Sequence, residues 1–165
     1  SGALLESPAL LQNLFALIDA EPLPQNWQLQ LEMLEVNLQQ PEADIARTLQ
    51  QLHQRGVLLA IDDFGTGQSN LEYIEKLPSS ELKIDKKFVQ HMASSEESRA
   101  VVRATIEIAH SLGKVVVAEG VEDEAVATAL RAMGCDQAQG YLFARAISMA
   151  ELLGMMAKGK NVVNG

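Results

Sequence analysis

Apolar residues recur at two alternating spacings along this chain of 165 residues. In some segments they return every three or four positions, which is the spacing of one face of a helix. Between these segments they alternate with polar residues or run without interruption, as they do in strands. The helical spacing predicts helices over residues 7–20, 41–55, 69–77, 98–112, 123–133 and 148–158. The other spacing predicts strands over residues 27–34, 57–61, 81–85, 114–118, 135–139 and 141–143.

Helices and strands alternate in this order, with short connections of the kind that join parallel strands through helices. Such a chain forms either a doubly wound sheet or a (β/α) barrel. No G-x-G-x-x-G or P-loop pattern occurs in the sequence, which argues against the nucleotide-binding doubly wound fold. A complete TIM barrel takes about 250 residues. We therefore expect an α/β fold, an incomplete TIM-type (β/α) barrel with five or six strands.

The stretch V-L-L-A-I-D-D-F-G-T-G over residues 57–67 organises the rest of the chain. Its apolar run predicts a strand that is buried on both faces of a parallel sheet. The strand is expected to end at Asp62 and Asp63, before a loop containing Gly65 and Gly67. Two neighbouring anions are costly unless a positive group lies between them. The pair therefore either binds a divalent cation or caps a helix or an Asx turn, and this stretch leaves both interpretations open.

Polar residues recur where the predicted strands end, which is the edge at which TIM-type barrels build their sites. These residues are Glu32, Asp62, Asp63, Lys83, Glu119 and Gln139. Carboxylates without histidine or cysteine suit Mg²⁺ or Mn²⁺. Two such ions about 3.5–4 Å apart can clamp a phosphodiester and activate a water. Lys83 would orient that water or stabilise charge on phosphate oxygens; alternatively, it forms a salt bridge with Glu32 or Glu119.

Composition narrows the range of partners. A hydrophobic content of 47% supports one substantial core. The net charge of −9 argues against binding to a nucleic-acid polymer, which requires a basic face. The one cysteine, Cys135, excludes an internal disulfide and fits a reducing cytoplasm. No apolar run reaches the length of about 20 residues that spans a membrane. We expect a cytoplasmic segment without direct membrane contact, which a longer, membrane-tethered parent could carry.

Four motifs carry a resemblance to a known family. They are D-D-F-G-T-G (62–67), E-L-K-I-D (81–85), V-V-A-E-G-V-E (116–122) and G-C-D-Q-A-Q-G-Y-L-F (134–143). In this order they resemble the motifs of the EAL family, bacterial cyclic di-GMP phosphodiesterases with a modified TIM barrel. The resemblance implies hydrolysis of cyclic di-GMP to linear pGpG with two Mg²⁺ or Mn²⁺ ions.

The resemblance also implies roles for individual residues. Glu32, Asp62, Asp63 and Glu119 would be metal ligands, and the last three would be catalytic together with Lys83, which would hold the attacking water. Gln139 would lie near the substrate or its water network, and Arg145 near the guanine. Thr66 belongs to the glycine loop after Asp63. Glu122 matches the glutamate that braces this loop.

The sequence departs from the family pattern in one main respect. It contains no E-A-L tripeptide, and the asparagine ligand that ends the family's next strand would fall before Ser1. We therefore expect residues 1–158 to correspond to the C-terminal two-thirds of the domain, lacking the first strands, with residues 159–165 as a frayed tail. Alone, this segment is expected to be weakly active or inactive.

Two further expectations concern partners. An open barrel exposes unpaired strand edges, so we expect a homodimer or a domain-swapped oligomer. The alternative to an enzyme is a non-catalytic cyclic di-GMP receptor or a protein-interaction and dimerisation module.

Overall fold

The computed structural model describes residues 7–21, 27–35, 43–66 and 71–157. Within these ranges the strands are β1 (Gln30–Leu34), β2 (Leu58–Phe64), β3 (Glu81–Ile84), β4 (Val115–Ala118) and β5 (Gln137–Ala138). The helices are α2 (Pro8–Ala20), α3 (Ala43–Gln54), α4 (Leu71–Lys76), α5 (Lys86–His91), α6 (Glu96–Ser111), α7 (Glu124–Ala132) and α8 (Met149–Ala157). The alternation of helices and strands follows the one that the apolar spacing predicts, except that α5 is added and the strand expected over residues 141–143 is absent.

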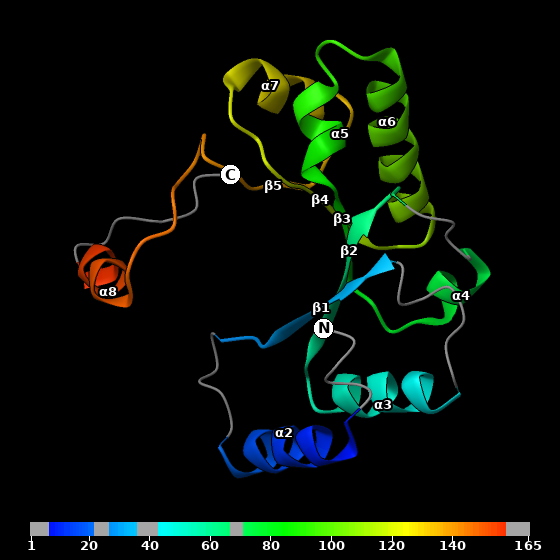
Figure 1. Cartoon of the computed structure of the whole chain (residues 1–165), viewed down its shortest axis with the longest axis vertical. Helices are drawn as coiled ribbons and strands as arrows, with labels where there is room; N and C mark the ends of the chain where they lie inside the picture. Colours follow the sequence, from blue (N-terminus) through cyan, green and yellow to red (C-terminus); the bar gives the residue numbers. More distant parts are fainter. Residues whose placement is uncertain (1–6, 22–26, 36–42, 67–70, 158–165) are drawn as a thin grey trace.

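The strands form one parallel sheet in the order β1-β2-β3-β4-β5. Each strand thus pairs with the next one along the chain, and among the described strands the order never reverses as it does in a doubly wound sheet. Figure 1 shows helices α3, α4, α6 and α7 arranged around the sheet, with α8 standing apart from it. The described part of the chain is therefore an arc of a (β/α) barrel, which confirms the expected fold class. Because all strands are parallel, their carboxyl ends lie along one edge.

The core lies between the sheet and these helices. Leu82 and Ile84 of β3 are fully buried, as is Val102 of α6, and Ile106 of the same helix is nearly so. Side chains alternate along a strand, so Lys83, between Leu82 and Ile84, points to the opposite face of the sheet. The register pairs Lys83 with Val117 and Ile84 with Ala118, immediately before Glu119. The packing of β3 against helices thus directs Lys83 to the inner face of the arc.

Helix starts follow the capping signals in the sequence. The hydroxyl of Ser7 accepts the N–H of Leu10 and so caps the start of α2. The hydroxyl of Ser95 accepts the N–H of Ser98, and the carboxylate of Asp123 accepts the N–H of Val126. These caps fix α6 and α7, the helices that flank β4 in sequence.

The structure differs from the sequence expectations at two elements. Residues 86–91 form α5, for which no helix was expected. Residues 141–143 form a turn, not a strand, after a β5 of only Gln137–Ala138. Expectations for residues 1–6, 41–42, 69–70 and 158–165, and for Gly67, lie outside the described residues. None of the described helices combines the length and apolar character needed to cross a membrane.

Candidate active site

The Asp62–Asp63 pair lies within strand β2, which continues to Phe64, so the expectation that the strand ends at the pair is wrong. The register with β3 shifts between Ile61 and Phe64, which marks a β-bulge. Asp63 adopts φ = 56°, in the left-handed region. Its N–H donates to Oδ1 of Asp62 over 3.0 Å. The bulge turns both carboxylates to the same side, although neighbours on a regular strand diverge.

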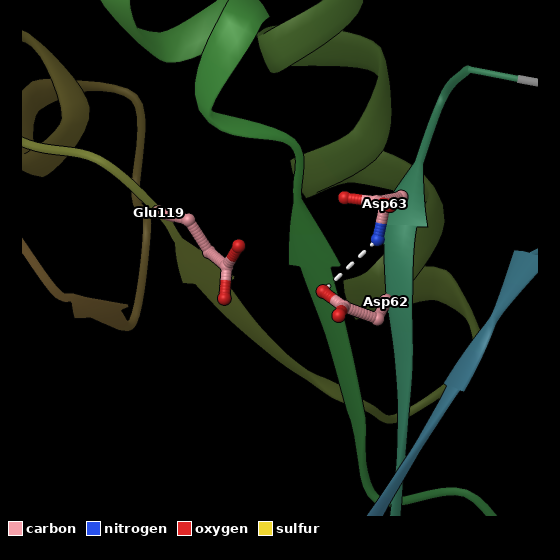
Figure 2. Close-up of side chains that lie close together, drawn as sticks. All are labelled: Asp62, Asp63 and Glu119. Atoms are coloured by element: carbon pink, nitrogen blue, oxygen red, sulfur yellow. Dashed lines mark hydrogen bonds between the residues drawn. The ribbon is translucent and has the colours of Figure 1, made fainter. Parts of the chain in front are cut away.

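The two aspartates converge with Glu119, which follows β4. One carboxylate oxygen from each of Asp62, Asp63 and Glu119 can be chosen so that all three lie within 4.8 Å of one another. Figure 2 shows the three side chains facing a common space, with Asp62 and Asp63 projecting from β2 toward Glu119. The hydrogen bond from the Asp63 N–H to Asp62 is the local type of contact that the capping interpretation predicts. That interpretation does not account for Glu119, which comes from a distant part of the chain.

Lys83 supplies a positive charge within this cluster. Its Nζ lies 2.5 Å from Oε1 of Glu119 and 2.7 Å from Oε1 of Glu32. Oδ1 of Asp62 lies 3.5 Å away. The Lys83 side chain is 6% exposed, whereas the Glu32 side chain is 51% exposed. The salt-bridge alternative for Lys83 is thus realised with both glutamates named for it, and with Asp62 as well.

Burial and neighbouring charges raise the pKa values of Lys83, Glu119 and Asp63. Burial opposes the charged form of Lys83, but hydrogen bonds to Glu119 and Glu32 outweigh it, and the pKa of Lys83 is raised. Burial raises the pKa of Glu119, and Lys83 offsets part of this rise. Burial also raises the pKa of Asp63, helped by the negative charges of Asp62 and Asp85. Anionic oxygens held this close together favour a cation.

The loop after β2 is braced by Glu35, a residue that the sequence reasoning did not single out. Glu35 follows β1 and is 1% exposed. Its Oε2 accepts the N–H groups of Gly65 and Thr66 over 3.0 and 3.1 Å. Glu122, to which this role was assigned, instead accepts the side-chain amide of Gln90 over 2.9 Å. At Gly65 and Thr66, the described part of this loop, the bracing carboxylate is therefore that of Glu35 and not that of Glu122.

The physical reason for this correction is strand adjacency. Residues that follow β1 lie beside the end of β2, because the two strands are paired up to Leu34 and Asp62. Glu122 follows β4 and lies beside α5. The signal in the sequence was the second acid of L-E-M-L-E, three positions after Glu32.

Gln139 and Arg145 line a cavity that opens beside Glu119. The Gln139 amide donates to Oε1 of Glu119 over 3.1 Å. Arg145 stacks over the ring of Tyr141, with 4.8 Å between its guanidinium carbon and the ring centroid. The cavity measures about 470 Å³, and Glu119, Gln139, Tyr141, Arg145, Lys86 and Gln90 lie on its wall. The cavity and the carboxylate cluster thus share Glu119.

The donor set fits a hard divalent cation. Asp62, Asp63 and Glu119 offer oxygen ligands alone, and partly buried carboxylates of this kind suit Mg²⁺ or Mn²⁺ better than zinc. Glu32 joins the cluster through Lys83 and not within the group of three converging oxygens. The structure thus brings Asp62, Asp63, Lys83 and Glu119, which the sequence places at the ends of predicted strands, into one cluster. Glu32 lies at the margin of this cluster.

Solved structures resemble this fold closely. The phosphodiesterase of MucR from Pseudomonas aeruginosa, solved as a c-di-GMP complex, has a TM-score of 0.85 and is 34% identical, with 92% of this chain and 61% of that chain covered. The EAL domain of DcpA from Mycobacterium smegmatis has a TM-score of 0.82 and is 37% identical, with 94% of this chain and 70% of that chain covered.

Curated sequences point the same way. The cyclic di-GMP phosphodiesterase RocR from Pseudomonas aeruginosa is 39% identical over 141 residues, which are 86% of this chain and 36% of RocR. The bifunctional diguanylate cyclase/cyclic di-GMP phosphodiesterase MucR is 43% identical over 109 residues, 66% of this chain and 16% of MucR. The chain thus spans well under half the length of these relatives. The EAL domain model matches residues 1–146. The chain belongs to the EAL domain family.

Proposed function

We propose that the chain is a cyclic di-GMP phosphodiesterase domain that hydrolyses its substrate to linear pGpG. The observation that carries this proposal is the convergence of Asp62, Asp63 and Glu119 on one space, with Lys83 in contact with Asp62 and Glu119. The EAL family is metal-dependent, and relatives are named as cyclic di-GMP phosphodiesterases. Water attack at phosphorus with cleavage of the P–O3′ bond would leave the 5′-phosphate of pGpG and a free 3′-hydroxyl.

The metal ligands would be Asp62, Asp63 and Glu119, with Glu32 at the margin of the site. Two Mg²⁺ or Mn²⁺ ions would lower the pKa of bound water and neutralise charge on the phosphodiester. Lys83 would donate its N–H groups to the attacking water or to a phosphate oxygen. Gln139 holds Oε1 of Glu119 and would keep that carboxylate oriented.

The cavity beside Glu119 would receive one end of the dinucleotide. Its wall carries the cationic side chains of Lys86 and Arg145, which can attract a phosphate in a chain whose net charge is −9. Arg145 is already held against Tyr141, so it offers a flat cation-and-ring surface on which a base could stack. We therefore place the guanine near Arg145 and the scissile phosphodiester near the carboxylates.

The glycine loop after Asp63 would couple the carboxylate cluster to the segment that follows β1. Thr66 and Gly65 donate to Glu35, so the loop that follows the aspartates is tied to β1. β1 and β5 are the terminal strands of the described sheet, and terminal strands of this kind support association as a homodimer or domain-swapped oligomer. A cytoplasmic location accords with the single, half-buried and unpaired Cys135.

The proposal is tested by incubating the chain with Mn²⁺ or Mg²⁺ and cyclic di-GMP and following pGpG by chromatography. Because the chain aligns with 61% of the MucR phosphodiesterase chain, we expect slow turnover that EDTA abolishes. Asp63→Asn should also abolish turnover, whereas Lys76→Met, at an exposed position of α4, should leave it unchanged. Metal-dependent binding without product would favour the receptor alternative. If the chain showed no binding of cyclic di-GMP and formed no product, both the proposed function and the receptor alternative would be contradicted.

A further inference from the structure

The ammonium of Lys83 and any divalent cation of the proposed site share two carboxylate groups, those of Asp62 and Glu119. Asp62 and Glu119 belong both to the group of converging carboxylates and to the ion pairs of Lys83. We propose that Lys83 is a built-in competitor for the metal: its ammonium holds the carboxylates together before metal binds and lowers the affinity for the incoming cation. This inference rests on the proposed function, and concerns the regulation of the same site.

The geometry makes the competition direct. Nζ lies within 3.5 Å of oxygens from Glu32, Asp62 and Glu119, which belong to β1, to β2 and to the residue after β4. Lys83 itself comes from β3, between β2 and β4 in the sheet. A single ammonium therefore ties four neighbouring segments together on one face. Asp63 is the cluster carboxylate that forms no ion pair with Lys83, and it is the one left to receive a cation without displacing the lysine.

The side chain of Lys83 cannot easily withdraw into solvent. It is 6% exposed, and its neighbours Leu82 and Ile84 are fully buried on the opposite face. A metal ion that binds Asp62 and Glu119 must therefore either lie close to the positively charged ammonium or displace Nζ from at least one of these carboxylates. In either case, like charges at a few ångströms in a partly buried site weaken binding substantially.

The same ion pairs stabilise the metal-free protein. Without Lys83, the partly buried carboxylates of Asp62 and Glu119 would repel one another without this counter-ion, which is a costly outcome for such a cluster. The two effects of the lysine therefore have opposite signs. Removing its charge should destabilise the metal-free chain and tighten metal binding.

The experiment compares wild type with Lys83→Met and Lys83→Gln at one fixed pH. Mn²⁺ affinity is measured by calorimetry without nucleotide, and the melting temperature is measured in EDTA and in saturating Mn²⁺. We expect either variant to bind Mn²⁺ about tenfold more tightly or better. We also expect a lower melting temperature in EDTA and a larger gain on adding Mn²⁺. Lys83→Gln keeps an N–H donor and serves if Lys83→Met does not fold without metal.

Lys114→Met is the matched control. Lys114 is buried to a similar degree, since the whole residue is 7% exposed against 5% for the whole of Lys83. Its Nζ, however, donates to the carbonyls of Ser79 and Leu77 at the other end of β4. The Lys114→Met substitution should lower the melting temperature equally with and without Mn²⁺, and it should leave the affinity for Mn²⁺ unchanged. Lys76→Met, in an exposed pair with Glu72, controls for the change in net charge.

Unchanged or weaker Mn²⁺ binding by both Lys83 variants would overturn the inference, as would absence of Mn²⁺ binding to wild type and variants alike. Since no nucleotide is present, these results are independent of substrate. If the Lys83 variants bind Mn²⁺ more tightly but wild type neither binds nor cleaves cyclic di-GMP, the competition stands and the proposed function fails. If wild type forms pGpG but the Mn²⁺ affinities of the Lys83 variants are unchanged, the proposed function stands and the competition fails.

Discussion

The carboxylate of Glu35 accepts the backbone N–H of Gly65 over 3.0 Å, and this contact joins β1 to the loop that follows the aspartate pair. Glu35→Ala should leave the N–H groups of Gly65 and Thr66 without this acceptor and destabilise the chain by about 2–4 kcal/mol. Hydrogen exchange at these two amides should accelerate. Glu122→Ala is the control: it should leave both amides unaffected, and acceleration in that variant instead would contradict the assignment to Glu35.

Gly65 should tolerate substitution less well than Gly56. Both have positive φ, 92° and 79°, so alanine strains the backbone at either position by about 1–2 kcal/mol. A Cβ on Gly65 would lie 3.1 Å from Cγ1 of Val101, whereas a Cβ on Gly56 would meet no atom within 4 Å. Urea unfolding should show that Gly65→Ala costs about 1 kcal/mol more than Gly56→Ala. Equal costs would show that Val101 moves aside freely.

Asp63→Asn should separate folding from metal binding. Asparagine tolerates the left-handed backbone at this position nearly as well as aspartate, so the melting temperature in EDTA should change little. The loss of a charged ligand should reduce Mn²⁺ affinity more than tenfold, and the stabilisation by added Mn²⁺ should shrink accordingly. Calorimetry and thermal melting measure both quantities. A large drop in the EDTA melting temperature would mean that the carboxylate is needed for the bulge itself.

Asp136 should contribute stability that is lost in acid. Its Oδ2 is 2.9 Å from the N–H of Val116 and 3.0 Å from Nε2 of His110. Burial works against the charge, but these two partners outweigh it and lower the pKa of Asp136 below 3.8. A lowered carboxyl pKa contributes stability that is fully present above the unfolded-state pKa and disappears as the pH falls through the folded-state pKa.

Asp136→Asn should therefore cost about 1 kcal/mol at pH 7, a modest figure because the side chain is 40% exposed. The cost should shrink as the pH falls below about 4. Urea unfolding of wild type and variant at several pH values tests this. A difference between the two proteins that is constant across the pH range would contradict it.

The edge of the sheet at which the polar side chains gather was predictable from local patterns, although β2 itself continues past the aspartate pair to Phe64. The apolar runs before Asp62 and Glu119, and the alternation around Lys83, required these side chains to meet at one edge of a parallel sheet, and they do. Gly56 and Gly113 in turn show positive φ where the sequence predicted helix ends. Each of these expectations needed only residues within one helix or strand and the rule that parallel strands share an edge.

The features that the sequence did not predict depended on neighbours in space. The role of Glu35 becomes visible only once β1 lies beside β2, whereas the resemblance to the family's motifs pointed to Glu122, after β4. Helix α5 spans Lys86–His91, too short for its apolar spacing to stand out, with Val89 as its buried residue. The apolar Tyr141 and Phe143 resembled a strand, yet both are exposed.

The bulge in β2 has a consequence for anyone who would transplant this aspartate pair. On a regular strand, two consecutive aspartates would point to opposite faces of the sheet, one toward the covering helices and the other away from them. What must be moved is the irregular backbone from Ile61 to Phe64, with the glutamate that holds the following loop. The ability of Asp62 and Asp63 to act together thus depends on the β-bulge and not on the Asp-Asp dipeptide alone.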